Sequence, residues 1–182
     1  MQSALGGNYL TPVLYFNSAG IIADNVFASP TSTDARKALV ITNVTGQKLL
    51  NKFKKNGAPF TDYVPVIRYA EVILNYAEAA AQNDNLPLAR TLLAAVRNRS
   101  DATYIFTTGV TTKAELIATI LNERRIELVG EGFRTPDLLR RVQTLPGKTG
   151  NAGVAPEVLP TASNYVWAIP SNELAYNKLA PK

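Results

Sequence analysis

The sequence predicts a mostly α-helical fold in which helix hairpins are joined by long irregular loops. Three observations support this prediction: an apolar repeat at helical spacing over residues 66–83, a second helix that begins with a proline close behind it, and a helix-capping pattern at Thr112. The 182 residues suffice for one domain with its own core. Apolar residues make up 46% of the chain, which excludes wholesale disorder.

The first 65 residues show little periodicity. Gly, Asn, Ser, Thr and Pro recur there, and only two short apolar runs, at residues 13–16 and 39–41, have the composition of strands. An irregular segment of this length is unusual in a free-standing domain. We therefore expect residues 1–65 to be an irregular segment that normally packs on a missing N-terminal part, and residues 66–182 to form a helical C-terminal domain.

Residues 66–83 form the clearest predicted helix. Apolar residues step by three and four along one helical face, at Ile67, Ala70, Leu74, Ala77 and Ala81. A second apolar face lies beside it, at Tyr69, Ile73, Tyr76 and Ala80. Only a narrow polar stripe remains, so we expect a largely buried helix with both tyrosines in the core.

A second helix follows after a short turn. Pro87 suits its first turn, and the pattern extends to about Arg99. The expected core face consists of Leu88, Leu92, Ala95 and Val96. Because so few residues separate the two helices, they should form an antiparallel hairpin of the tetratricopeptide kind.

Thr112 and Glu115 form a T-x-x-E capping box that opens a third helix through about Val129. Its expected inward residues are Leu116, Ile117, Ile120, Leu121 and Leu128. Gly130 and Gly132 should end it. We further expect a short helix over residues 137–142 with Thr135 as its cap, a surface loop over residues 144–164, and a last helical turn over residues 171–176 with Ser171 as N-cap.

Missing residue types exclude several kinds of chemistry. The chain has no Cys and no His, which excludes thiolate nucleophiles, imidazole bases and Cys/His zinc sites. We expect no catalytic residue, no metal site and no cofactor. The net charge of +5 and the basic run at residues 51–56 permit nucleic-acid binding, but no known DNA- or RNA-binding module accompanies them, so nucleic acid is not an expected partner.

The densest group of charges lies in residues 122–141. One interpretation makes two carboxylates at helical spacing the acid and base of a glycosidase. Interleaved opposite charges instead favour a structural network of salt bridges across the bundle. The members of the expected network are Arg68, Glu71, Glu78, Glu123, Arg124, Glu127, Glu131 and Arg134.

Aromatic side chains matter if the ligand is a carbohydrate, because sugar rings stack on them while amides bind the hydroxyl groups. Tyr9, Tyr15 and Asn17 in the irregular opening segment are the expected ligand-binding residues. Trp167, the single tryptophan, lies in an alternating stretch and is expected to pack on the helical bundle.

Three blocks of sequence, in order, resemble the SusD/RagB family, the starch-utilisation-system-like nutrient-binding lipoproteins. The first is TDYVPVIRYAEVILNYAEA at residues 61–79. The second is ERRIEL at residues 123–128, continuing through EGFR to DLLRR at residues 137–141. The third is WAIPSNEL at residues 167–174, and Asp34 with Arg36 matches an Asp-x-Arg that the family often shows.

The resemblance implies a non-catalytic protein whose tetratricopeptide-like helix pairs serve as a scaffold. Members bind glycans or other nutrients and sit as a lid on a SusC-like TonB-dependent transporter. They are surface-exposed lipoproteins of the outer membrane in Bacteroidetes-type bacteria. Their ligand residues lie largely on variable loops, so the matching blocks do not identify the glycan.

The sequence also departs from the family pattern. Phe133 stands where members commonly have His, and residues 135–136 stand where they commonly have an aromatic pair. No signal peptide and no lipid-anchor Cys is recognisable, so we expect the C-terminal part of such a protein. The alternative function is a helical-repeat module that binds protein and no sugar.

Overall fold

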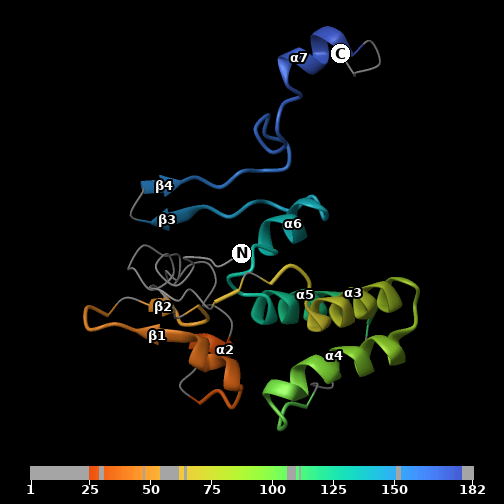
Figure 1. Cartoon of the computed structure of the whole chain (residues 1–182). Helices are drawn as coiled ribbons and strands as arrows, with labels where there is room; N and C mark the ends of the chain where they lie inside the picture. The colour runs from red at the N-terminus through yellow and green to blue at the C-terminus, as the bar shows by residue number, and fades with distance from the viewer. Residues whose placement is uncertain are drawn as a thin grey trace.

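The structure, a computed structural model, is mostly helical. It describes residues 25–28, 31–46, 48–53, 62–63, 65–105, 110, 112–150 and 153–177. Figure 1 shows a helical bundle with small β hairpins beside it and an arm that leads away from the bundle to the last helix. In chain order the elements are α2 (Asn25–Ala28), the 3-10 helix η1 (Ala35–Leu39), β1 (Val40–Thr42), β2 (Lys48–Leu50), α3 (Tyr69–Gln82), α4 (Leu86–Ser100), α5 (Lys113–Glu127), α6 (Arg134–Leu139), β3 (Lys148–Gly150), β4 (Gly153–Ala155) and α7 (Ser171–Tyr176).

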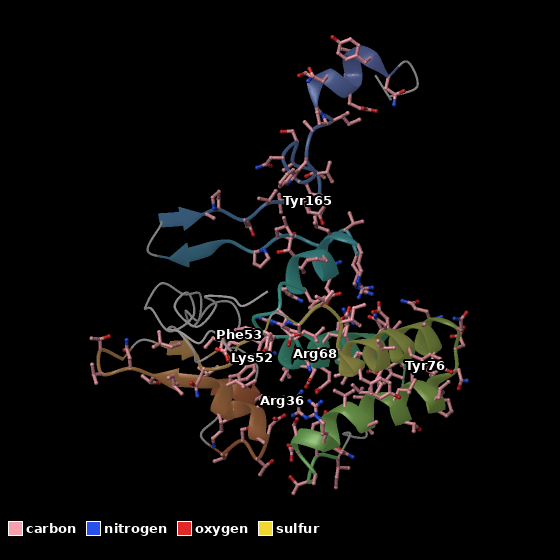
Figure 2. The ribbon with its side chains drawn as sticks, in the orientation of Figure 1. Arg36, Lys52, Phe53, Arg68, Tyr76 and Tyr165 are labelled. Atoms are coloured by element: carbon pink, nitrogen blue, oxygen red, sulfur yellow. The ribbon has the colours of Figure 1, made fainter. Side chains whose placement is uncertain are left out.

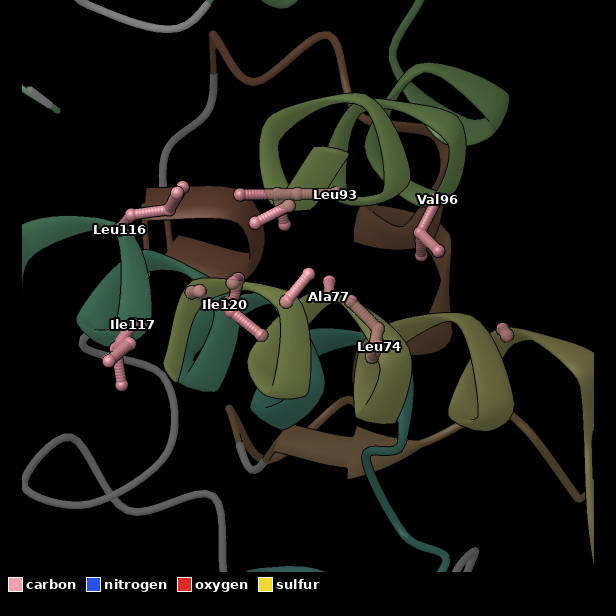
Figure 3. Packing of buried hydrophobic residues seen from close by; sticks show 11 residues of the cluster. Leu74, Ala77, Leu93, Val96, Leu116, Ile117 and Ile120 are labelled. Carbon is pink, nitrogen blue, oxygen red and sulfur yellow. The ribbon is translucent and has the colours of Figure 1, made fainter. Parts of the chain in front are cut away.

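Helices α3, α4 and α5 enclose the main core. In Figure 3, Leu93 and Val96 of α4 lie across from Leu74 and Ala77 of α3, and Ile120 of α5 lies beside them. The buried members of this core are Ala70, Leu74, Ala77, Ala80, Ala81, Ala89, Leu93, Val96, Leu116, Ile117 and Ile120. Alanine is frequent among them, and its small side chain lets the helices approach closely. The expected hairpin of α3 and α4 is thereby confirmed.

The buried face of α3 is only half of what the apolar pattern predicts. Ala70, Leu74, Ala77 and Ala81 are buried as expected. Tyr69 and Tyr76 are 80% and 54% exposed, so their expected place in the core is wrong. Of the polar stripe, Glu78 is buried where it pairs with Arg140, whereas Asn75 and Gln82 are exposed.

The core face of α4 also differs from the prediction. Ala89, Leu93 and Val96 are buried, whereas Ala95 is exposed. Leu88 and Leu92 lie at the edge of the core and are partly buried. The buried face therefore runs through Ala89 and Leu93, one residue after the predicted Leu88 and Leu92.

Helix α5 begins and ends as predicted. The Thr112 side chain accepts a hydrogen bond from Glu115 N, and the Glu115 side chain accepts one from Thr112 N, which completes the capping box. Gly130 and Gly132 follow the helix with φ angles of 77° and 84°. Such positive angles favour glycine over any other residue.

A second, smaller core lies where residues 26–53 meet the end of α5. Val26, Phe27, Leu50 and Phe53 pack there against Ile126 and Val129. Strands β1 and β2 pair antiparallel, with Val40 opposite Leu50, so the strand expected near residues 39–41 is confirmed. The described part of the opening segment therefore rests directly on α5.

Two predictions after α5 are wrong in detail. Helix α6 begins at Arg134 after the N-cap residue Phe133, so Thr135 and Pro136 lie inside its first turn rather than before it. The expected loop over residues 144–164 contains the antiparallel hairpin of β3 and β4, which is extended by a bridge between Leu145 and Val158. Short strands rich in Gly and Thr lack the apolar alternation that predicts strands.

The C-terminal arm, residues 159–177, has one buried anchor. Tyr165 is buried, and its hydroxyl donates a hydrogen bond of 2.7 Å to the Gln143 carbonyl. Trp167 is 97% exposed, so its expected packing on the bundle is wrong. Helix α7 follows Pro170 as N-cap, not Ser171, and buries no residue. No described helix of the chain has the length and apolar character that crossing a membrane requires.

Candidate functional site

A buried guanidinium, that of Arg36, joins three carboxylates. Arg36 follows Asp34, the N-cap of η1, whose side chain accepts a hydrogen bond of 2.8 Å from Arg36 N. Its Nη2 lies 2.7 Å from Asp34 Oδ2, and its Nη1 lies 2.6 Å from Glu123 Oε1 and 2.9 Å from Glu127 Oε2. Both glutamates come from α5, and Figure 2 shows Arg36 between the helices. The carboxylates are thus occupied by a structural partner.

The end of α4 contributes two further arginines to the same group. Arg97 Nη1 lies 3.1 Å from Glu123 Oε2 and 3.4 Å from Asp34 Oδ2. Arg99 Nη2 lies 2.7 Å from Glu127 Oε1. The Arg97 guanidinium also lies 4.3 Å from the centre of the Tyr104 ring, a favourable cation–π distance. The group therefore ties η1, α4 and α5 together.

Arg68 and Lys52 pair with carboxylates at and just after the end of α5. Arg68 Nη1 lies 2.8 Å from Glu127 Oε1, and its Nε lies 2.8 Å from Glu131 Oε2. Its Nη2 donates to the Glu127 carbonyl, which is one of the free carbonyls at the end of α5. Lys52 pairs with Glu131 and donates to the Val129 carbonyl. We call these nine residues the Arg36 network: Asp34, Arg36, Lys52, Arg68, Arg97, Arg99, Glu123, Glu127 and Glu131.

Two acids of the network, Glu127 and Asp34, have lowered pKa values. Burial alone would raise the pKa of Glu127, but hydrogen bonds from Arg99 and Arg68 hold it below its ordinary value. Burial would likewise raise the pKa of Asp34, but hydrogen bonds from Arg36 outweigh burial, so the pKa of Asp34 is also lowered. A glycosidase acid needs a raised pKa in order to hold its proton at neutral pH. Glu127 therefore cannot serve as the proton donor of the glycosidase alternative.

Lys52 responds to burial in the opposite sense. Burial lowers the pKa of Lys52, and its pairing with Glu131 offsets this effect only in part. The pKa values of Arg36 and Arg68 are raised, because their carboxylate partners outweigh burial. Among the residues that the structure describes, no group of His, Cys, Asp and Glu side chains is arranged to hold a metal ion.

A second charged group connects α3, α5 and α6. Arg124 Nε lies 3.0 Å from Asp137 Oδ2, and Arg124 also donates to Asn75 on α3. Arg140 Nη2 lies 2.7 Å from Glu78 Oε2, and its Nε lies 3.0 Å from Asp137 Oδ1. Through these contacts, two polar residues of α3, Asn75 and Glu78, are joined to α5 and to the C-terminal end of α6.

The structure brings most of the expected charged residues together, in two groups rather than one. Arg68, Glu123, Glu127 and Glu131 belong to the Arg36 network, and Arg124 and Glu78 belong to the second group. Glu71 lies apart from both, with one carboxylate oxygen buried and without a hydrogen-bond partner. Arg134 is exposed at the start of α6.

Sequence reasoning missed five members of the Arg36 network: Asp34, Arg36, Lys52, Arg97 and Arg99. Helical spacing reveals only partners on one helix, whereas these five come from other elements. The Asp-x-Arg at residues 34–36 carried a signal, since Asp is a favoured N-cap residue.

Outside the charged groups, an apolar surface is exposed along α3. Tyr69, Val72, Tyr76 and Ala79 follow one another along its solvent side, and we call these four residues the α3 outer face. Figure 2 labels Tyr76 on α3. Exposed aromatic rings can stack on sugars or on apolar groups of a protein. The expected ligand residues Tyr9, Tyr15 and Asn17 lie outside the described residues.

Comparison with known proteins identifies the family to which this architecture belongs. A family model described as the SusD family matches residues 25–179. The chain belongs to the SusD family. A SusD superfamily protein from Bacteroides fragilis shares 30% sequence identity with it, at a TM-score of 0.71 over 94% of this chain and 39% of that one. A second superfamily protein, from Bacteroides vulgatus, shares 28% identity at a TM-score of 0.64 over 88% of this chain and 38% of that one.

The name of another relative describes a function. A protein from Bacteroides vulgatus, provisionally named as sugar-binding, shares 27% identity at a TM-score of 0.61 over 79% of this chain and 34% of that one. No match is found among the curated proteins. The chain spans less than two fifths of the length of the SusD superfamily structures that it matches.

Proposed function

We propose that this chain belongs to a non-catalytic protein that binds glycans, or other nutrients of that kind, at the outer membrane of a bacterium. The observation that carries the proposal is the SusD family match over residues 25–179. The relative named as sugar-binding supports the glycan as ligand. Both Bacteroides superfamily structures support an outer-membrane lipoprotein as the setting.

The mechanism is capture followed by hand-off. Aromatic rings stack on the sugar, amide groups bind its hydroxyls, and the bound glycan passes to a SusC-like TonB-dependent transporter. In this proposal the Arg36 network serves as scaffold, because its carboxylates are occupied by arginine and lysine side chains. In this proposal residues 66–182 form a helical domain and residues 1–65 an irregular segment.

Glycan binding is tested by calorimetry with a panel of oligosaccharides. We expect at least one to bind, and we expect the double substitution Tyr9→Ala and Tyr15→Ala to abolish that binding, with Asn17→Ala weakening it. Trp167→Ala is the matched control, since its ring is exposed elsewhere on the chain. An affinity that survives the double substitution would remove these tyrosines from the site, and a panel without any binder would contradict the proposed ligand class.

Delivery to a transporter is tested separately. A native-membrane preparation that carries this protein with an affinity tag should yield a TonB-dependent transporter as a stoichiometric partner. Protease treatment of intact cells should remove the tagged protein if it lies on the cell surface. Recovery without a transporter, or protection from the protease, would contradict these parts of the proposal.

The alternative function, a protein-interaction module of helical repeats, has an observation of its own. The α3 outer face is apolar and exposed, and surfaces of this kind are typical of protein interfaces. A chain that binds protein through this face and binds no member of the glycan panel would favour the alternative.

A further inference from the structure

The residue Val142, shortly after α6, has a backbone conformation that its side chain disfavours. Its φ angle is 53°, in the left-handed region. The other described residues with positive φ are Gly46, Gly130, Gly132 and Asp84. Glycine adopts this region freely and Asp tolerates it, whereas a β-branched residue is strained there. The Val142 side chain is 64% exposed, so its own packing does little to offset the strain.

Two backbone hydrogen bonds hold Val142 in this conformation. Val142 N donates to the Leu139 carbonyl at 3.0 Å, and Gln143 N donates to the Leu138 carbonyl at 2.9 Å. This pair of bonds is a Schellman motif, in which the position of Val142 usually belongs to glycine. A rotation about the φ angle of Val142 moves Gln143 N away from its acceptor. The bond from Val142 N precedes the rotated bond and survives the rotation.

The chain beyond Val142 is joined to itself. We call residues 143–150 and 153–177 the distal segment. Within it, β3 pairs with β4, and Leu145 and Val158 exchange two backbone hydrogen bonds of 2.9 Å. The buried Tyr165 donates its hydroxyl proton to the carbonyl of the first residue of the segment. These contacts make the distal segment a unit with its own internal bonds.

The distal segment has little packing against the helical bundle. Among the described elements, β3 and β4 pack on each other, and none of the more extensive contacts joins them or α7 to α3, α4 or α5. In Figure 1 the chain leaves α6, runs into the hairpin of β3 and β4, and then leads on to α7. Val142 therefore lies at the junction of two bodies. Residues that absorb a large change in φ at such a junction act as hinges.

We propose that Val142 is a strained hinge, about which the distal segment turns as a unit relative to the helical bundle. The structure shows one orientation, in which Val142 is left-handed and the Schellman motif is closed. In the other orientation Val142 is extended and the bond from Gln143 N is broken. The turn carries Trp167 and α7 to a new position beside the bundle.

The energies on the two sides of this equilibrium are of comparable size. Relief of the left-handed strain favours the extended form of one residue by about 5–30-fold. The net loss of one backbone hydrogen bond opposes it by about 2–12-fold. Neither effect overwhelms the other, so both orientations are populated. The proposal does not depend on glycan binding.

The two orientations are measured as distances between two spin labels by double electron–electron resonance. The chain has no Cys, so Ala95→Cys on α4 and Ala155→Cys on β4 place one label on each side of the hinge, both at exposed positions. We expect two distance populations, one of them at the separation that the structure gives. Val142→Asn should reduce the second population at least about fivefold, because Asn tolerates the left-handed region.

Two further variants make the measurement specific to the hinge. Val166→Asn is the matched control, because Val166 is an exposed valine of the distal segment whose φ is not positive, and both populations should stay unchanged. Val142→Pro fixes φ near −65° and should leave only the second population. Circular dichroism shows whether each variant remains folded. A single population at the separation of the structure would overturn the proposal, as would a second population that Val142→Asn does not reduce.

Amide hydrogen exchange tests whether the distal segment turns as a unit. Rotation at Val142 frees the amide of Gln143 and keeps the bonds between Leu145 and Val158 intact. Gln143 should therefore exchange faster than Leu145 and Val158, and Val142→Asn should slow the exchange of Gln143 alone. Equal exchange at the three amides would indicate unfolding of the distal segment and contradict the hinge.

Discussion

At the scale of single residues, Arg36 has the most consequential position. It is 7% exposed and contacts three buried carboxylates that come from two elements. Burying such a charged group costs desolvation energy, which offsets much of its contribution to stability. Removing it is nevertheless strongly destabilising, because its buried partners then lack a counter-charge. The other arginines of the network replace it only in part: Arg97 and Arg99 share Asp34 Oδ2 and Glu127 Oε2 with Arg36. Glu123 Oε1 pairs with Arg36 itself.

We predict that Arg36→Met lowers the free energy of unfolding by about 3–5 kcal/mol, because it leaves buried carboxylates partly unpaired. Urea unfolding followed by circular dichroism measures the change. Lys113→Met is the control, since Lys113 pairs with an exposed Asp84 and should cost at most about 1 kcal/mol. Equal losses in the two variants would show that the Arg36 network does not contribute as a buried group.

The same network predicts a dependence on pH. The pKa values of Asp34 and Glu127 are lowered in the folded chain, so the unfolded chain binds more protons in acid and stability rises with pH there. The contribution is complete above the ordinary values, 3.8 for Asp34 and 4.5 for Glu127, and is lost as the pH falls through the folded values. The urea midpoint should therefore drop on acidification below these values. A midpoint that stays constant there would contradict the assignment.

Substitutions at two glycines distinguish the cost of backbone strain from the cost of overpacking. Gly130 and Gly132 both have positive φ, but a Cβ on Gly130 would overlap the buried Leu50 side chain, whereas a Cβ on Gly132 has open space around it. Gly132→Ala should cost about 1 kcal/mol from backbone strain alone. Gly130→Ala should cost about 1–3 kcal/mol more, since the second core must move. Thermal unfolding of both variants checks the difference, and equal costs would contradict it.

At the scale of elements, the sequence predicted helices well and faces less well. The bounds of α3, α4 and α5 fall within about three residues of their predicted ends, because caps, prolines and glycines are local signals. Which side of α3 faces inward depends on Arg124, Arg140 and other partners from distant elements. Local periodicity contains no such information, so the tyrosines were misplaced.

The charged residues of the candidate site were likewise predicted only in part. Charged residues spaced along one helix, such as Glu123 and Glu127, were predictable as a group, while their partners Arg36 and Arg99 were not. Strands β3 and β4 were missed because Gly and Thr give no apolar alternation. The position of Trp167 was missed because alternation predicts a buried side without showing that any surface covers it.

The capping box of α5 gives a prediction for a single element. Thr112→Ala removes the acceptor for Glu115 N and should lower the free energy of unfolding by about 1 kcal/mol. Thr112→Ser keeps the hydroxyl and should retain most of the stability. Urea unfolding of the two variants measures this difference. Equal stabilities would show that the cap contributes nothing beyond the packing of α5.

At the scale of the whole molecule, the bundle and the C-terminal arm differ in how they are held. The bundle has its core and two charged groups, whereas the arm has Tyr165 as its one buried residue between positions 159 and 177. Figure 1 shows α7 at the far end of this arm. Segments with few buried contacts open locally at a low cost in free energy.

Limited proteolysis with chymotrypsin should distinguish these two regions. Within the part of the chain that the structure describes, early cleavage is expected after Trp167, which is exposed outside any helix. Tyr69 and Tyr76 are exposed too, but they belong to α3 and should resist until the bundle unfolds. Mass spectrometry of the early fragments identifies the sites. Early cleavage in α3 would contradict the expected stability of the bundle.

The long reach of Arg36 has a consequence for how the chain folds. Its pairs with Glu123 and Glu127 join positions 87 and 91 residues apart, whereas α3 and α4 meet across a short turn. Contacts between near neighbours form early in folding, and distant ones must wait for a large loop to close. Substituting Arg36 should therefore speed unfolding and leave refolding nearly unchanged, while Leu93→Ala should slow refolding. In stopped-flow experiments, this result would show that Arg36 forms its contacts only after the transition state for folding.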